Sequence, residues 1–210
     1  MLSIVSAYYN KEDMTREFLD NLQKVTPKCE MILTNAGSQP IEHPFITKRV
    51  DLEENRSFSN SMNAGLKEST GDYVCVINND AFPSEGWLDN LVALAERTGA
   101  WIVSPLNSQT NLASYSHLQQ FDGYFECDMF PAVCWLIKRE CLDKVGLFDE
   151  QFALGCYEDN DYCRRVLEAG GKIVVDTRTN ITHLVSQTIS QFDIQQMMHS
   201  NYQRYINKWS

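Results

Sequence analysis

The sequence lacks a run of about 18 apolar residues, the minimum for a helix that spans a membrane. Its first residues, MLSIVSAYYNKEDM, have no basic segment before the apolar stretch, which a secretory signal peptide would need. We therefore interpret this stretch as the first strand of a domain. Together, the two absences predict a cytoplasmic protein without a transmembrane segment.

Closely spaced cysteine pairs are also missing, because none of the seven cysteines forms a C-x-x-C motif. Several lie in apolar stretches, such as Cys75 in YVCVI and Cys134 in AVCWLI. An odd number of scattered cysteines in such surroundings favours buried free thiols in a reducing compartment over disulfides or zinc.

Basic residues are scarce relative to acidic ones, with 18 Lys and Arg against 28 Asp and Glu and a net charge of −10. A protein of this charge repels the phosphate backbone of nucleic acids. We therefore do not expect nucleic acid as a partner.

The 210 residues contain no repeat, linker or low-complexity segment, and 43% of them are hydrophobic. This length and composition predict one domain with a substantial core. In residues 1–105, continuous apolar runs alternate with segments whose apolar residues recur at helical spacing. Strands that are apolar throughout are covered on both faces. The pattern therefore predicts an α/β fold with a mostly parallel central sheet flanked by helices.

Some element boundaries are predicted more specifically. The first helix is expected over residues 10–25 with Asn10 as its N-cap, and two short strands are expected over 172–177 and 180–185. The tail over 190–209 has apolar residues near one helical face. We expect this tail to pack on the domain or against a second copy in a homodimer, with a membrane surface as the alternative.

Polar residues gather where three of the apolar runs end, in AYYN at 7–10, TNAGS at 34–38 and INND at 77–80. Parallel strands share one carboxyl edge, and ligands of such sheets bind there. We therefore expect the clusters to lie together. By itself, NAGS is compatible with a tight turn or with a loop that contacts a base or phosphate.

Asp80, in INND, is a candidate ligand for a hard cation, since such ions often take one or two protein carboxylates plus substrate phosphates. The alternative is that Asn78, Asn79 and Asp80 only form the turn before Pro83.

Glu158, Asp159 and Asp161 crowd the start of the helical segment YEDNDYCRR. They suit either compensation of the helix dipole or a general base that faces a cleft. His183 stands alone in the apolar strand NITHLV, where a hydrogen-bonded core histidine is the more common role than a metal ligand.

In their order and spacing, these motifs resemble the family 2 glycosyltransferases of the GT-A fold, from Leu2 to about Val185. The family's Asn-x-Gly-Phe-(x)4-Asn-x-Gly helix is matched by NRSFSNSMNAG, with Ser57 in the glycine position. Its Gly-Asp-Tyr-(apolar)-Leu-Asn-Asn-Asp stretch is matched by GDYVCVINNDAF. The later signatures are matched by CWLIKRECLDKVGLFDEQF and by YEDNDYCRRVLEAGGKI.

The resemblance implies one glycosyltransferase domain over 1–210. Its nucleotide-sugar-binding half would span 1–105, its acceptor and catalytic half 106–185, and its helical tail 186–210. The implied donor is a nucleoside diphosphate sugar, with a UDP-sugar as the first expectation, and the implied cation is Mn²⁺ or Mg²⁺. Asp80 and His183 would bind the cation. The implied donor-contacting residues are Tyr8, Tyr9, Asn35, Arg56, Asn78 and Asn79.

For catalysis, the resemblance implies that Asp159 is the general base and that Glu158 orients acceptor hydroxyls, in a transfer that inverts the anomeric centre. Asp161 is expected to play a structural role by pairing with Arg164 or Arg165. The acceptor is left open among a saccharide, a lipid-linked glycan, a protein and a modified base. Trp135 would either stack on a sugar or pack in the core.

Two other functions remain as alternatives. A nucleotidyltransferase that makes sugar nucleotides would carry a glycine-rich loop after the first strand, but SAYYNKED contains no glycine. A non-catalytic sugar- or nucleotide-binding relative would have no need of Asp80, Asp159 and His183.

Overall fold

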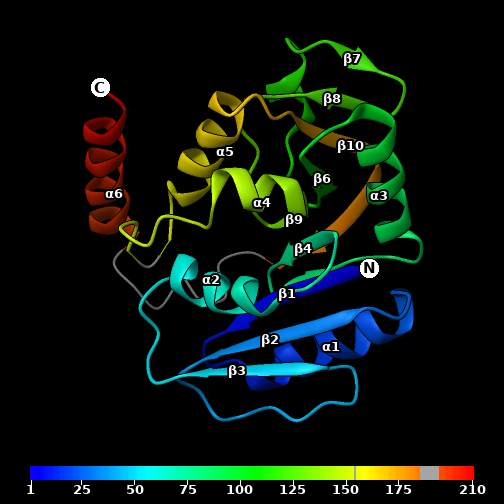
Figure 1. Cartoon of the computed structure of the whole chain (residues 1–210), viewed down its shortest axis with the longest axis vertical. Coiled ribbons are helices and arrows are strands. Elements are labelled where there is room, and N and C mark those ends of the chain that lie inside the picture. The colour runs from blue at the N-terminus through cyan, green and yellow to red at the C-terminus, as the bar shows by residue number, and fades with distance from the viewer. Residues whose placement is uncertain (154, 185–193) are drawn as a thin grey trace.

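A computed structural model describes residues 1–153, 155–184 and 194–210 of the chain (Figure 1). Its helices are α1 (Glu12–Val25), α2 (Phe58–Glu68), α3 (Trp87–Thr98), α4 (Arg139–Val145), α5 (Glu158–Glu168) and α6 (Ile194–Trp209), with a 3-10 helix η1 (Leu112–Tyr115). Its strands are β1 (Leu2–Tyr8), β2 (Glu30–Ala36), β3 (Lys48–Leu52), β4 (Tyr73–Ile77), β5 (Ala81–Phe82), β6 (Ile102–Asn107), β7 (Gln120–Phe121), β8 (Tyr124–Glu126), β9 (Cys134–Lys138) and β10 (Ile173–His183).

The described strands form one ten-stranded sheet in the order β3-β2-β1-β4-β9-β6-β10-β8-β7, with β5 paired to β10. Strands β3, β2, β1, β4, β6 and β10 run in the same direction, whereas β9 and β8 run opposite to them. The predicted α/β fold with a mostly parallel sheet is therefore confirmed. Within the described ranges, no helix combines the length and hydropathy that a membrane span requires.

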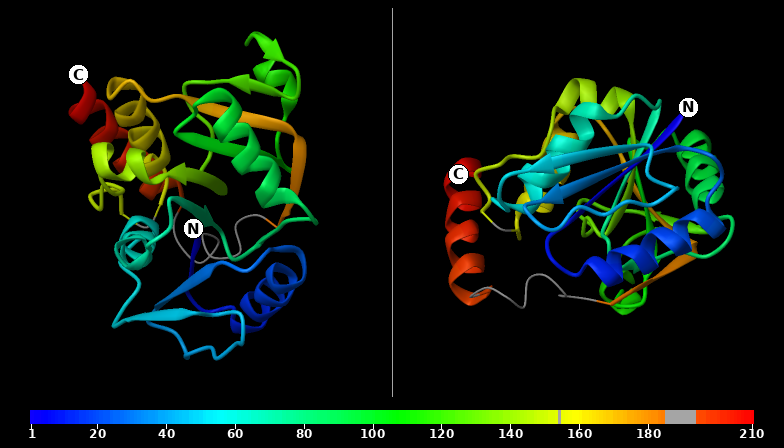
Figure 2. Two further views of the ribbon diagram at one scale, coloured as in Figure 1. Left: turned by 45° about the vertical axis from the view of Figure 1, so that its right-hand side comes forward. Right: turned by 90° about the horizontal axis from the view of Figure 1, so that it is seen from below.

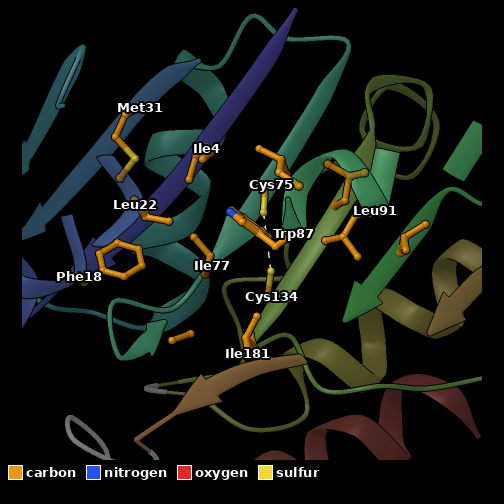
Figure 3. Packing of buried hydrophobic residues seen from close by; sticks show 14 of the residues in the cluster. Ile4, Phe18, Leu22, Met31, Cys75, Ile77, Trp87, Leu91, Cys134 and Ile181 are labelled. Atoms are coloured by element: carbon orange, nitrogen blue, oxygen red, sulfur yellow. Dashed lines mark hydrogen bonds between the residues drawn. The ribbon is translucent and has the colours of Figure 1, made fainter. Parts of the chain in front are cut away.

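Helices cover both faces of the sheet (Figure 2). Helices α1 and α3 pack on one face, where Phe18, Leu22, Trp87 and Leu91 join strand residues such as Ile4 in a fully buried cluster (Figure 3). Helices α2, α4 and α5 cover the other face. In the first cluster, Cys75 Sγ and Cys134 Sγ lie 3.8 Å apart. All seven cysteines are free thiols, and five of them are buried, whereas Cys29 and Cys156 are partly exposed.

Two predicted boundaries are wrong. Helix α1 begins after Lys11, not Asn10, because both residues adopt left-handed backbone, and the Asn10 backbone nitrogen donates to Ser38 Oγ. The two strands expected near the end of the sheet are one strand, β10, with a bulge between Asp176 and Asn180. The Asp176 carboxylate accepts hydrogen bonds from Arg178 N and Thr179 Oγ1, so the bulge is held and the strand continues.

Helix α2 lies unusually close to the sheet at Gly65. A Cβ added there would lie 2.5 Å from Val5 Cγ1 and 3.0 Å from Thr34 Oγ1. Two residues earlier on the same helix, the Asn63 amide exchanges hydrogen bonds of 2.9 and 3.0 Å with the backbone of Phe148. Helix α2 is thus held against β1 and β2 on one side and against the chain after α4 on the other.

Gly65→Ala is expected to lower the free energy of unfolding by about 1–3 kcal/mol, because overpacking against β1 and β2 outweighs the better helix propensity of alanine. Chemical denaturation measures the change. Lys67→Ala, at an exposed position of the same helix, is the control and should stay within about 0.5 kcal/mol of the wild type. A Gly65→Ala variant as stable as this control would contradict the close-packing argument.

Candidate functional site

Asp80 and His183, far apart in the sequence, meet at the carboxyl edge of the sheet. His183 Nε2 lies 3.2 Å from Asp80 Oδ1, and their side chains are only 12% and 9% exposed. Backbone pairing brings them together, because His183 is the partner of Ala81 in the β5–β10 ladder and Leu184 N donates to Asp80 O. Ser108 further fixes His183, accepting from its backbone nitrogen and donating to its carbonyl oxygen.

The INND turn that carries Asp80 is held on two sides. Asn78 N donates to Val133 O, while Asn79 Nδ2 donates to Thr15 Oγ1 of α1 at 2.9 Å. Asn78 Oδ1 is buried and has no hydrogen-bond partner. The Asn79 side chain thus already has a hydrogen-bond partner within the fold, so its predicted contact with the donor has no support in the geometry. Asn78, in contrast, has a side-chain oxygen that could accept a hydrogen bond.

This donor set fits a divalent cation. A carboxylate and an imidazole face each other, and the unpartnered amide oxygen of Asn78 belongs to the same turn. Across the described parts of the chain, no group of three or more His, Cys, Asp or Glu side chains is arranged to hold a metal. The pair therefore suits an ion that completes its coordination with water and phosphate oxygens.

The acidic residues at the start of α5 adjoin this turn through the residues just before β9. The backbone of Ala132 hydrogen-bonds to the Asp159 carboxylate, and the next residue, Val133, accepts the hydrogen bond from Asn78. Asn160 N also donates to Asp159 Oδ1 at 2.8 Å. The half-buried Asp159 carboxylate and the Asp80–His183 pair are thus linked through the two residues Ala132 and Val133, which precede β9.

Burial perturbs both members of the Glu158–Asp159 pair. Burial raises the pKa of Glu158 to about 8, and the neighbouring charge of Asp159 adds to that rise. Burial also raises the pKa of Asp159, while backbone hydrogen bonds from Asn160 and Ala132 oppose the shift. Glu158 Oε2 has no hydrogen-bond partner. Burial and the proximity of a second carboxyl group thus both favour the protonated form of Glu158.

Asp161 has the structural role expected of it. Its carboxylate is fully buried and accepts from Arg165 Nε at 2.9 Å, one of the two pairings predicted. Lys208 Nζ and Trp209 Nε1, both on α6, also contact it at 2.7 and 3.0 Å. The sequence carried no signal for these last two contacts, because they join separate helices.

Two of the predicted donor contacts are side chains that the fold already uses. Tyr8 is 2% exposed, and its hydroxyl donates to Gln39 O and accepts from Ile41 N. Asn35 is 3% exposed, and its amide exchanges hydrogen bonds with the backbone of Ser38 and donates to Asp51 Oδ1. The predicted donor contacts of Tyr8 and Asn35 therefore have no support in the geometry.

Tyr9 and Arg56 remain near the same edge with accessible side chains. Tyr9 is half-buried after β1, and Arg56 is exposed, with Glu54 Oε1 2.9 Å from its Nε. Gly37, with a φ of 81°, allows the NAGS turn to approach Glu54 closely, since an added Cβ would lie 2.9 Å from the Glu54 Cα. The segment that carries Arg56 thus lies against the NAGS turn.

Trp135 packs in the core, which was one of its two predicted roles. It is fully buried and stacks on Phe148 with ring centroids 6.1 Å apart. Glu150 was not expected from the sequence, but its carboxylate accepts hydrogen bonds from Asn60 and Asn63 of α2. These hydrogen bonds lower the pKa of Glu150. In the sequence, only the asparagines of the NRSFSNSMNAG motif pointed to a polar partner of this kind.

The comparisons with known proteins agree with one another on the family. The profile of the family described as glycosyl transferase family 2 matches residues 3–146. The pre-mycofactocin glycosyltransferase of Mycobacterium tuberculosis is 25% identical over an alignment of 174 positions, which covers 73% of this chain and 37% of that protein. The chain therefore spans well under half the length of this relative.

Two solved structures share the fold. The mannosyltransferase PcManGT from Pyrobaculum calidifontis, in complex with GDP-Man and Mn²⁺, matches with a TM-score of 0.75 at 18% identity. This match covers 89% of this chain and 57% of that one. GalNAc-T7 with UDP, GalNAc and Mn²⁺ matches with a TM-score of 0.72 at 14% identity, over 87% of this chain and 43% of that one. These likenesses show a GT-A glycosyltransferase fold.

The burial of Glu158 predicts a pH-dependent stability. Its pKa is raised in the folded state, so the folded chain binds more protons than the unfolded chain between about pH 4.5 and 8. Stability contributed by the protonated carboxyl is therefore lost as the pH rises through this window. Glu158→Gln should remove this loss. The free energy of unfolding of the variant minus that of the wild type should therefore increase from pH 4.5 to pH 8, by an amount on the order of 2 kcal/mol.

Urea denaturation at several pH values between 4.5 and 8.5 measures the difference. The matched control is Glu168→Gln, an exposed position on the same helix that pairs with Arg164 at 3.6 Å. Its pH dependence should follow that of the wild type. Parallel curves for Glu158→Gln and the wild type would show that Glu158 titrates normally and would contradict the buried-pair description.

Proposed function

Because the chain belongs to glycosyl transferase family 2, we propose that it transfers a sugar from a nucleoside diphosphate sugar to an acceptor hydroxyl. The observation that carries this proposal is the meeting of Asp80 and His183 at 3.2 Å on the carboxyl edge of the sheet. The Glu158–Asp159 pair adjoins that site through Ala132 and Val133, which supports the proposal that a proton acceptor lies near the bound diphosphate.

Asp80 and His183 would hold a divalent cation, which would neutralise the negative charge that the departing diphosphate acquires. The imidazole of His183 favours Mn²⁺ over Mg²⁺, because Mg²⁺ prefers an all-oxygen shell. Asn78 offers an unpartnered amide oxygen for a hydroxyl of the ribose or the sugar. Tyr9 and Arg56 flank the adjacent turn, where they would contact the base and the diphosphate.

In the proposed reaction, an acceptor oxygen attacks the anomeric carbon while the bond from that carbon to the diphosphate oxygen breaks. The electron pair of the broken bond leaves with the diphosphate. Attack from the opposite face in a single displacement inverts the anomeric centre. The acceptor hydroxyl must lose its proton as it attacks, and a carboxylate within reach accepts it.

Asp159 is the proposed base, and its environment suits that role. Burial raises its pKa, which makes the carboxylate a stronger base. Glu158, with the pKa raised to about 8, would hold a proton at neutral pH. A protonated Glu158 donates a hydrogen bond, so it would orient an acceptor oxygen next to Asp159.

Nucleotide release from UDP-, GDP- and dTDP-sugars, with Mn²⁺ and in the presence of saccharide, lipid-linked and peptide acceptors, tests the transfer. We expect nucleotide release from one donor class to be much faster than from the others, and we expect that class to be the UDP-sugars. Asp159→Asn should lower turnover by about 100-fold or more, because the amide cannot accept the proton. Equal, background-level release from every donor would overturn the proposed function.

Removal of either proposed cation ligand should weaken metal binding. Calorimetric titration of Mn²⁺ in the presence of UDP should show binding to the wild type, and Asp80→Asn and His183→Ala should each weaken it by about 10-fold or more. Asp72→Asn is the matched control. That exposed carboxylate pairs with the N-terminal amine at the opposite end of β4. Unchanged Mn²⁺ affinity in both ligand variants would exclude the site.

A further inference from the structure

Helix α6 carries a fully buried asparagine, Asn201. Its Nδ2 lies 3.0, 2.7 and 3.1 Å from the backbone carbonyl oxygens of Ala153, Gly155 and Cys156, to which it donates. Its Oδ1 accepts a 2.8 Å hydrogen bond from Arg204 Nη1 on the same helix. Both ends of this amide are therefore used, and its nitrogen binds the segment that leads into α5.

That segment has a backbone that L-residues rarely adopt. The φ angles of Gly155, Cys156 and Tyr157 are 145°, 71° and 70°, so a glycine and two non-glycine residues with positive φ follow one another. Such conformations persist only where surrounding contacts determine them. The carbonyl oxygens of Gly155 and Cys156 find their partner on α6, which makes Asn201 one of those contacts.

Other side chains of α6 hold the same region. The ring of Tyr157 lies 5.7 Å from the rings of both Tyr202 and Tyr205. The buried Asp161 carboxylate receives Lys208 and Trp209, also from α6. Figures 1 and 2 show α6 lying alongside α5. Contacts of three kinds, amide, aromatic and ionic, therefore join this helix to the start of α5.

We propose that α6 is a clamp and that Asn201 is a positioning residue for the Glu158–Asp159 pair. Glu158 and Asp159 immediately follow Tyr157, so the backbone direction at 155–157 sets where both carboxyl groups project. The inference rests on the proposed function, because α6 affects the reaction only if Asp159 is the base. Asn201 acts through the backbone, and its hydrogen bonds reach neither Asp80 nor His183.

Two substitutions test the clamp. Asn201→Asp keeps the shape of the side chain but replaces its N–H donors with a carboxylate oxygen, and Asn201→Ala removes the amide. Each should lower kcat by about 10- to 100-fold, because a small displacement of a catalytic group has a large effect on rate. The Kd for UDP with Mn²⁺ should stay within about threefold of the wild type, since that site is built on other elements.

The matched control is Asn207→Ala, which removes an exposed asparagine from the same helix. Its kcat and its UDP affinity should equal those of the wild type. Arg204→Ala provides a milder test at an exposed position, since Arg204 Nη1 donates to the Asn201 amide oxygen. It should lower kcat by about 2- to 5-fold, and it keeps the inference testable if the Asn201 variants do not fold.

Amide hydrogen exchange gives a readout that does not depend on activity. In the Asn201 variants, the amides of residues 155–160 should exchange faster than in the control, while those of β1, β2 and β4 stay protected. A folded Asn201→Ala variant with the kcat and exchange of the control would refute the clamp and leave the transfer reaction standing. A wild-type chain that consumes no donor would refute the proposed function, and exchange would then decide whether α6 holds this segment.

Discussion

The short ladder between β5 and the end of β10 is the constraint on which the rest of the site depends. Its register pairs Ala81 with His183 and so places the preceding carboxylate, Asp80, against the imidazole. Strand β10 reaches this position because of its bulge, after which it continues beside β6 and then meets β5. Bulges commonly re-aim a strand near a functional site. The Asp176 carboxylate, which holds the bulge, thus influences a site with which it shares no contact.

A second constraint lies in the segment before α5, where a strained backbone leads directly into the two acidic residues Glu158 and Asp159. Each left-handed non-glycine residue costs about 1–2 kcal/mol, and Cys156 and Tyr157 are both in this conformation. Asn63 of α2 binds the backbone of Phe148 earlier in the same loop, and Asn201 of α6 binds the carbonyl oxygens of Gly155 and Cys156. Two buried asparagines therefore offset part of a conformational cost that the position of the acidic pair requires.

The sequence predicted what depends on local pattern. Apolar runs located the strands of the first half, and the polar clusters correctly marked the edge where Asp80 lies. Local pattern could not show that β9 would insert between β4 and β6, because strand order depends on long-range pairing. For the same reason, the sequence did not reveal the hydrogen-bond partners of Tyr8, Asn35 and Asn79. These partners are distant in the chain. The same limit also explains why the contacts of Asn201 were not foreseen.

The amide at position 78 has a consequence for how the proposed site would work. With Asp80 as its single carboxylate and His183 as a neutral ligand, the pair offers a cation only one full negative charge. Asn78 contributes an oxygen but no charge. The remaining charge must come from the diphosphate, so the cation and the nucleotide would each raise the affinity of the site for the other. By thermodynamic linkage the two enhancements are equal, which makes metal and donor a cooperative pair of ligands.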